Sequence, residues 1–236
     1  MIIKTRNTRN GSVIILGFGF DHVVLATGSS WRGDGIGRAL LKPLAPTRAE
    51  VFTPDELMAG ARPVAREVLL FDDDHYYMGG VLAELLAQAG CDVTLITPAP
   101  FVSDWSRNTL EQRAVHVRLV EAGVKIVLNR GVAAIHADGV ETNCSYTDAR
   151  DRTGCDAVVI VASRLSNDAV FVSLMAREAE WAAAGIRSVR LIGDAAAPGP
   201  IAWATYAGHR YARELDVPGI GDALPFRREI TALAAD

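Results

Sequence analysis

An apolar strand, three consecutive aspartates and an apolar helix follow one another along the chain, and they constrain its fold more than any other feature. The strand is predicted over residues 68–71 and the helix over residues 78–89. A dinucleotide-binding fold carries its glycine-rich phosphate loop at this strand-to-helix turn. The turn here holds Asp72, Asp73 and Asp74, whose charges repel a phosphate. The stretch predicts a nucleotide-type fold that either no longer turns over a dinucleotide or holds its ligand in an unusual way.

The order of the predicted elements indicates the fold class. Beyond residue 67, apolar strands alternate with helices, and one crossover contains short β-prone pieces. We expect an α/β protein with a Rossmann-like parallel sheet, helices on both faces of that sheet and a small antiparallel meander over residues 125–142. The main strands are predicted at 68–71, 92–97, 156–162 and 189–194, and the helices at 78–89, 108–121, 168–184 and 200–215.

The two ends of the chain predict a second, incomplete part. Residues 12–18 and 21–28 are both β-prone and close in sequence, which favours a hairpin. We assign residues 63–188 to an ADP- or NAD(P)-binding-like Rossmann domain. Residues 1–62 and 189–236 are assigned to an incomplete flavin-domain-like layer, the remnant of a second FAD/NAD(P)-binding-type domain.

The composition argues against several classes of function. A net charge of −4 over 236 residues argues against a nucleic-acid partner, which needs clustered positive charge. No apolar run reaches the roughly 20 residues that span a bilayer, and the N-terminus lacks the apolar core of a signal peptide. Cys91, Cys144 and Cys155 form no CxxC pair, so neither a zinc nor an iron–sulfur site is predicted. We expect a reduced cytoplasmic protein with no membrane contact.

Two short motifs together indicate a flavin dinucleotide site. A strand that ends in Ala-Thr-Gly28 lets the chain turn sharply beside a flavin, although any buried strand can end at a glycine. Gly193 and Asp194 end another strand just before a helix, where the carboxylate can accept from a ribityl hydroxyl and the helix dipole faces phosphates. Asp194 can also simply cap the turn that follows it.

The three aspartates admit two roles of their own. Hard divalent cations prefer carboxylate oxygens, but neighbouring carboxylates on a turn diverge and rarely bind one ion together. The alternative is that they cap the helix that starts near Met78 and favour its positive end. We favour the cap and predict no metal site.

Specific NAD binding and side-chain catalysis lack their usual residues. A dinucleotide site places an acid at the end of the second strand to hold the ribose hydroxyls. That strand ends in Thr97, which offers only a weaker ribose hydrogen bond. His75, beside Tyr76 and Tyr77, is the histidine with a site-like setting, and a structural role is favoured for it. No serine or cysteine lies on a recognisable catalytic turn, so no catalytic residue is predicted.

Several segments are similar to the C-terminal half of the trimethylamine dehydrogenase-like flavoproteins. This group includes dimethylamine and histamine dehydrogenases and, more distantly, 2,4-dienoyl-CoA reductase. The resemblance covers residues 20–228 and rests on residues 21–32, 72–80, 103–112, 192–198 and 201–209. It implies an oxidoreductase family in which an N-terminal barrel binds FMN and oxidises amines, and a four-iron cluster passes electrons onward. The C-terminal half is implied to hold ADP without a redox role in the amine dehydrogenases, and FAD with NADPH in the dienoyl-CoA reductases.

The chain departs from this family pattern. The catalytic barrel, the cysteine cluster and the first βαβ unit with its glycine fingerprint have no counterpart in residues 1–19. We therefore expect a C-terminal fragment, with FMN and the 4Fe-4S cluster confined to the N-terminal part. Without the first βαβ unit, a tight FAD site is not expected, and Gly28 and Asp194 would be remnants of one.

The acidic turn is similar to the ADP-holding version of the amine dehydrogenases. The resemblance places an adenine nucleotide over this turn, with two glycines that allow close backbone approach. The residues implied are Asp74, His75, Tyr76, Tyr77, Met78, Gly79 and Gly80.

The function expected is that of a nucleotide-binding C-terminal portion that is not catalytic alone. The alternative is a stand-alone NAD(P)H- or FAD-dependent oxidoreductase, which the paired glycine motifs favour. A third interpretation is a remnant with no function of its own. The expected partners are an FMN-barrel subunit or a second copy, bound through an exposed sheet edge.

Overall fold

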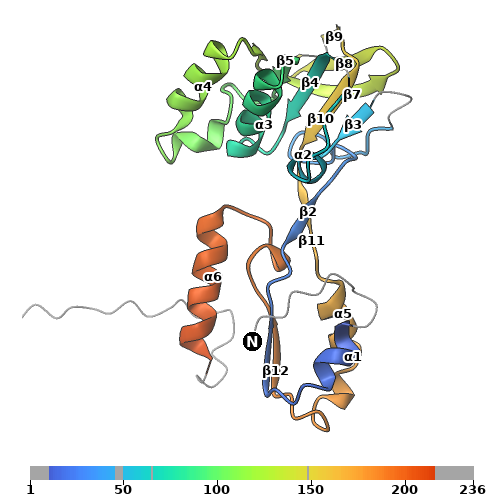
Figure 1. Ribbon diagram of the computed structural model, residues 1–236, viewed down its shortest axis with the longest axis vertical. Coiled ribbons are helices and arrows are strands. Elements are labelled where there is room, and N and C mark those ends of the chain that lie inside the picture. Colours follow the sequence, from blue (N-terminus) through green and yellow to red (C-terminus); the bar gives the residue numbers. More distant parts are fainter. Residues whose placement is uncertain (1–10, 46–49, 65, 148, 216–236) are drawn as a thin grey trace, which may run out of the picture. The chain divides into compact units, whose positions relative to one another are not determined.

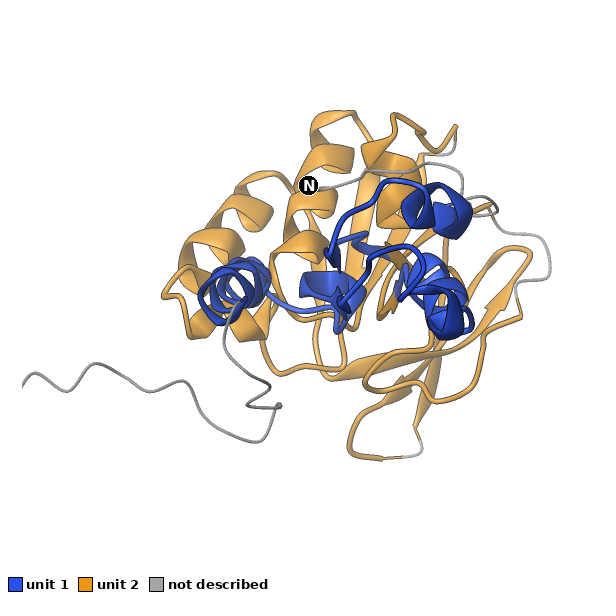
Figure 2. Cartoon of the chain, turned by 90° about the horizontal axis from the view of Figure 1, so that it is seen from below, with its two compact units in different colours: residues 1–29, 166–236 blue, residues 30–165 orange. Residues whose placement is uncertain are grey.

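The computed structural model describes residues 11–45, 50–64, 66–147 and 149–215. The chain divides into two compact units, coloured separately in Figure 2. Unit 1 contains residues 1–29 and 166–236, and unit 2 contains residues 30–165. The domain bounds expected from the sequence, at residues 62 and 188, stay a prediction.

A parallel sheet forms the centre of unit 2 (Figure 1). It has five strands in the order β3-β10-β4-β5-β6, and every neighbouring pair is parallel. The middle strand β4 is almost wholly buried, as its apolar sequence predicts. Val161, at the end of β10, lies opposite Asp72, at the end of β4. The strands are β3 (Glu50–Phe52), β4 (Glu67–Asp72), β5 (Asp92–Ile96), β6 (Lys125–Val127) and β10 (Ala157–Val161).

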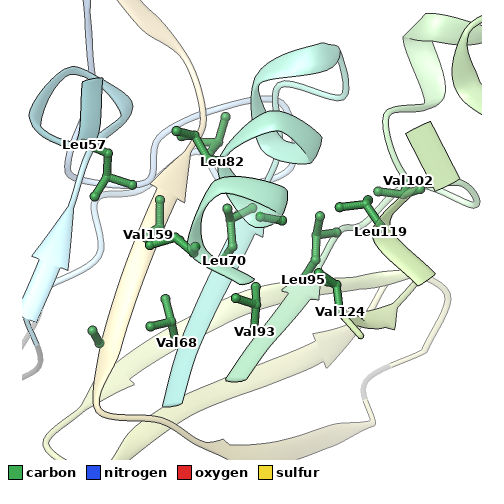
Figure 3. Packing of buried hydrophobic residues seen from close by; sticks show 14 of the residues in the cluster. Leu57, Val68, Leu70, Leu82, Val93, Leu95, Val102, Leu119, Val124 and Val159 are labelled. Carbon is green, nitrogen blue, oxygen red and sulfur yellow. The ribbon is translucent and has the colours of Figure 1, made fainter. Parts of the chain in front are cut away.

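One face of this sheet is covered by helices. Side chains alternate between the faces of a strand, so Val68 and Leu70 of β4 pack in a cluster with Leu82 of the longest helix of the unit (Figure 3). Leu86 of the same helix also belongs to this cluster. The helices are α2 (Pro54–Met58), α3 (Tyr77–Gln88) and α4 (Gln112–Glu121). The predicted helix over 108–121 begins later because Leu110 adopts a left-handed φ of 64°, and a 3-10 turn, η1 (Asp104–Arg107), precedes it.

The other face is covered by the expected antiparallel meander. Leu69 and Phe71 point to this side and pack with Val132, Ile135 and Val140. The meander consists of β7 (Arg130–His136), β8 (Gly139–Cys144) and β9 (Arg150–Gly154). The predicted α/β class with its parallel sheet and meander is confirmed. Within the described residues of unit 2, the buried apolar residues on this second face come from strands and loops and not from helices. The reason is that the crossover from β6 to β10 forms the meander.

Unit 1 also combines strands and helices. Its strands β1 (His22–Leu25) and β12 (Ser188–Leu191) pair in parallel. The helical elements are α1 (Gly11–Leu16), α5 (Ala169–Met175), η2 (Glu178–Glu180), η3 (Gly193–Ala195) and α6 (Ile201–Glu214). A further short pair is formed by β2 (Ser29–Trp31) and β11 (Arg164–Ser166), whose residues are divided between the two units.

The N-terminal hairpin prediction is wrong. Residues 11–16 form helix α1, and the partner of β1 is distant in sequence. Ile15 is buried in one cluster with Leu174 of α5, and the Ser12 and Ser173 hydroxyls lie 2.8 Å apart. Contacts with α5 therefore decide the conformation of a segment whose β-prone residues suggested a strand. Within the described residues, no helix is long and apolar enough to cross a membrane.

Candidate functional site

The acidic turn lies at the carboxyl end of β4, beside the end of β10. The amides of Asp73 and Asp74 donate to the carbonyl of Val161 over 2.8 and 3.1 Å. From β4 the chain winds through β5 to β6 on one side, whereas β10 and β3 lie on the other. Open α/β sheets bind ligands at such a switch point, outside the carboxyl ends of the strands. The turn therefore occupies the expected ligand position of this sheet.

Asp72 is completely buried in this turn. Its Oδ1 accepts a hydrogen bond from the His75 amide over 3.0 Å. Its Oδ2 is buried without a hydrogen-bond partner. Burial disfavours the charged form and raises the pKa of this carboxyl to about 7.

Asp73 is held by another part of unit 2. Its carboxylate accepts the Ala39 amide at 2.9 and 3.2 Å, and its Oδ1 lies 3.4 Å from Nε2 of His75. Asp73 Oδ1 and His75 Nε2 are therefore within ion-pair distance, but Nε2 makes no hydrogen bond. Burial also raises the pKa of Asp74, against the opposing charges of Arg164 and Arg38.

The predicted helix cap is wrong. Helix α3 has Tyr76 at its N-cap, and no side chain makes a capping hydrogen bond there. The carboxylates of Asp72 and Asp73 instead accept amides of the preceding turn and of a distant loop. In the part of the chain that the structure describes, no group of three His, Cys, Asp or Glu side chains is arranged to hold a metal ion.

The glycines of this turn are closely packed. A Cβ atom on Gly79 would lie 2.5 Å from the Asp72 carboxylate, and one on Gly80 would lie 2.8 Å from Val115. Their lack of a side chain is therefore required by the helix packing itself. A role in nucleotide approach stays a prediction, as does any role of Met78, which packs against the core cluster.

A cavity of about 490 Å³ opens beside the turn. Of the predicted site residues, only His75 lines this cavity. The other lining residues were not predicted individually from the sequence. Trp105 donates its amide to the His75 carbonyl over 2.8 Å, and its ring contacts Tyr76 edge-on at 4.7 Å. The lining residues are Arg38, His75, Asp104, Trp105, Arg107 and Asn108.

The cavity combines positive charge with an aromatic surface. The Arg107 guanidinium lies 4.8 Å above the ring of Phe101, and Arg107 pairs with Asp104 at 3.4 Å. Arg38 interacts electrostatically with Asp74. Guanidinium groups and an indole together suit an anionic ligand with a planar ring. Four of the lining residues lie in segment 103–112, which carried part of the family resemblance in the sequence.

Thr97 lies apart from the open cavity. It is fully buried, and its hydroxyl accepts the Ala99 amide over 3.3 Å. A ribose hydrogen bond to this hydroxyl would require its turn to open.

The remaining predicted site residues come together in unit 1. The Asp194 carboxylate accepts from the Ser29 hydroxyl at 3.1 Å and from the Gly199 amide at 3.2 Å. Gly28 and Gly193 have left-handed φ angles of 76° and 61°, which a side chain disfavours. The structure thus sorts the candidate residues into two groups, one in each unit.

Known proteins match both parts of this architecture. Residues 52–159 match the model of the family described as "OYE-like second alpha/beta domain". The dimethylamine dehydrogenase of Hyphomicrobium sp. (strain x) is 34% identical over 240 residues, which cover 91% of this chain and 32% of that protein. The structure of histamine dehydrogenase from Rhizobium sp. 4-9 is 57% identical with a TM-score of 0.89, over 98% of this chain and 34% of that one. The chain is homologous to the C-terminal part of the trimethylamine dehydrogenase-like flavoproteins.

A third similar protein is named for a different activity. The structure of 6-hydroxypseudooxynicotine amine oxidase from Pseudomonas geniculata N1 is 38% identical with a TM-score of 0.80, over 85% of this chain and 30% of that one. The chain spans about a third of the length of each of these relatives. The resemblance drawn from the sequence is confirmed.

Proposed function

We propose that this chain acts as a nucleotide-binding C-terminal portion of an amine-dehydrogenase-like iron–sulfur flavoprotein and is not catalytic by itself. The observation that carries the proposal is the buried acidic turn at the switch point of the sheet. Asp72 and Asp73 are both buried there, and their carboxylates disfavour a pyrophosphate at the strand end, where a dinucleotide fingerprint would hold it. Hydride transfer from NADPH therefore has no place at this turn.

The proposed ligand is an adenine nucleotide such as ADP, bound over residues 74–80 and in the adjoining cavity. Arg38 and Arg107 offer positive charge for its phosphates, and Trp105 offers a flat surface for its base. A volume of about 490 Å³ is in the usual range of small-molecule sites. The ligand itself is suggested by the family resemblance, and the charge of the cavity supports it.

The amine chemistry is proposed to belong to the other two thirds of such a flavoprotein. FMN and a 4Fe-4S cluster would be bound there, together with the residues that oxidise the amine and transfer its electrons. The relatives are named for dimethylamine and histamine, yet both match nearly all of this chain. This portion is therefore not expected to select the amine.

Helix α6 of unit 1 is the proposed docking element for an FMN-barrel partner or a second copy. None of its residues is buried. The large side chains of Ile201, Trp203 and Tyr206 expose 63%, 61% and 57% of their surface. Aromatic side chains exposed together are typical of interaction surfaces. We place the assembly in the cytoplasm, where its three free cysteines would stay reduced.

Isothermal titration of the purified chain with ADP, NADPH and FAD tests the nucleotide proposal. We expect ADP to bind in a one-to-one ratio and NADPH and FAD not to bind. Arg38→Ala should weaken ADP binding, because it removes a cavity charge. Arg66→Ala is the matched control, since Arg66 lies at the amino end of the sheet with Asp92. Tight NADPH or FAD binding together with diaphorase activity would contradict the proposal.

A stand-alone NAD(P)H- or FAD-dependent oxidoreductase is the second candidate. The cluster of Ser29, Asp194 and Gly199 favours it, because a carboxylate placed just before a helix can hold a ribityl chain. A yellow protein that reduces an artificial acceptor with NADPH would support this candidate. A colourless protein without that activity would support the first.

A further inference from the structure

A loop of unit 2 lies across the acidic turn. We call residues 35–40 the strap. The amide of Ser163, just after β10, donates to the carbonyl of Ile36 over 3.2 Å. The amide of Gly37 donates to the carbonyl of Leu40 over 3.0 Å, which folds the strap back on itself. The strap is thereby tied to the end of β10.

The carboxylate of Asp73 ties the strap to the end of β4. Both of its oxygens lie within hydrogen-bond distance of the Ala39 amide, and its side chain is fully buried. A Cβ atom on Gly37 would lie 2.2 Å from Oδ2 of Asp73 and 3.3 Å from Ala162. Only a glycine fits between the carboxylate and Ala162, so the strap packs closely against the turn.

This arrangement resembles the contacts of a dinucleotide fingerprint, but the anion comes from the protein and not from a ligand. There, amides of a glycine-containing loop approach the pyrophosphate of the ligand at the switch point. Here, an amide of a glycine-containing strap meets a carboxylate of the protein at the same place in the sheet. The charge that a ligand phosphate would supply is supplied by Asp73.

We infer that the strap is a built-in occupant of the switch-point crevice, that it excludes a dinucleotide, and that Asp73 positions Arg38 in the cavity that stays open. Arg38 directly precedes the latched Ala39 and lines the cavity with His75 and Trp105. The specificity of unit 2 for a smaller anion over a dinucleotide then depends on Asp73. The part of the inference that concerns Arg38 rests on the proposed nucleotide site, whereas the exclusion of a dinucleotide does not.

Hydrogen–deuterium exchange tests the strap without any assumption about ADP. In the wild-type chain, a large excess of NADPH should leave the exchange of residues 36–39 and 73–76 unchanged. Asp73→Asn and Gly37→Ala should each speed exchange at Ala39 about tenfold or more, because each disturbs a charge-assisted hydrogen bond. Asp92→Ala, at the amino end of the same sheet, should leave Ala39 unchanged. Protection of these residues by NADPH, or unchanged exchange at Ala39 in both Asp73→Asn and Gly37→Ala, would overturn the inference.

Titration with ADP tests the positioning of Arg38. Asp73→Asn and Arg38→Ala should each weaken ADP binding about tenfold, and the double variant should be no weaker than either single one, because both changes remove one interaction. Additive effects, or an Asp73→Asn variant with wild-type affinity, would show that Asp73 does not act through Arg38. If the wild-type chain binds no ADP, the proposed function fails, while the exchange data still decide whether the strap excludes a dinucleotide.

Discussion

The carboxylate of Asp72 lies where a side chain on Gly79 would have to be. A Cβ atom at position 79 would come within 2.5 Å of both Cγ and Oδ2 of Asp72. Gly79 is in the first turn of α3, and Asp72 is the last residue of β4. The pair therefore brings the helix directly onto the strand end and closes the turn around a buried carboxyl.

Gly79→Ala should destabilise the chain by about 1–3 kcal/mol, because overpacking at a buried contact displaces either the helix or the carboxylate. Urea unfolding followed by circular dichroism measures the change. Gly208→Ala in helix α6 is the control, since nothing lies within 4 Å of a Cβ at that position, and it should be neutral or stabilising. Equal effects of the two substitutions would contradict the packing explanation.

The contribution of Asp72 to the stability of the chain should fall as the pH rises towards neutrality. The pKa of Asp72 is about 7 in the folded chain, against about 3.9 when unfolded. The folded state holds this proton more tightly, so its contribution is complete below the unfolded pKa and is lost as the pH rises through the folded pKa. The raised pKa of Asp74 acts in the same direction.

Asp72→Asn should remove most of this pH dependence. The amide keeps an oxygen for the His75 amide but does not ionise. The free energy of unfolding of the variant, relative to wild type, should increase by at most about 1.4 kcal/mol per pH unit between about pH 4 and 7. Denaturant titrations at several pH values measure this difference, and parallel curves would contradict the assignment to Asp72.

The cysteines should differ in reactivity towards iodoacetamide. A hydrogen bond from Thr147, aided by backbone amides, lowers the pKa of Cys144, whereas burial raises the pKa of Cys155 to about 11. The thiolate is the reacting species, so Cys144 should be alkylated faster at neutral pH in chains that keep one cysteine each. Thr147→Val should slow Cys144 and leave Cys155 unchanged.

Asp194→Ala should loosen the turn that follows β12 in unit 1. The Ser29 hydroxyl and the Gly199 amide lose this acceptor, at a cost of about 1–3 kcal/mol. Faster hydrogen exchange at Gly199 would show it. Asp168→Ala is the matched control, because Asp168 precedes α5 without a capping hydrogen bond from its side chain. A similar loss of protection in the control would mean that the carboxylate of Asp194 has no special role.

The sequence predicted the parts of the fold whose signals are local. Strand β4 follows from a continuous apolar run, and helix α3 and the meander follow from periodic or alternating apolar residues and from nearby glycines. The conformation of residues 11–16 could not be read in this way, because burial of Ile15 against α5 decides it. The start of α4 could not be predicted either. Leu110 adopts a left-handed φ, and nothing in the sequence marks a leucine for that conformation.

The sequence by itself determined that three carboxylates replace a phosphate loop between a buried strand and a helix. It also indicated the homology to the C-terminal part of the trimethylamine dehydrogenase-like flavoproteins, because the matching segments are specific in combination. Only the tertiary structure decided what the carboxylates bind. Asp72 faces Gly79 and Asp73 binds Ala39, which is 34 positions away along the chain. Such partners depend on how the strap and the sheet pack, and no local pattern of residues specifies that packing.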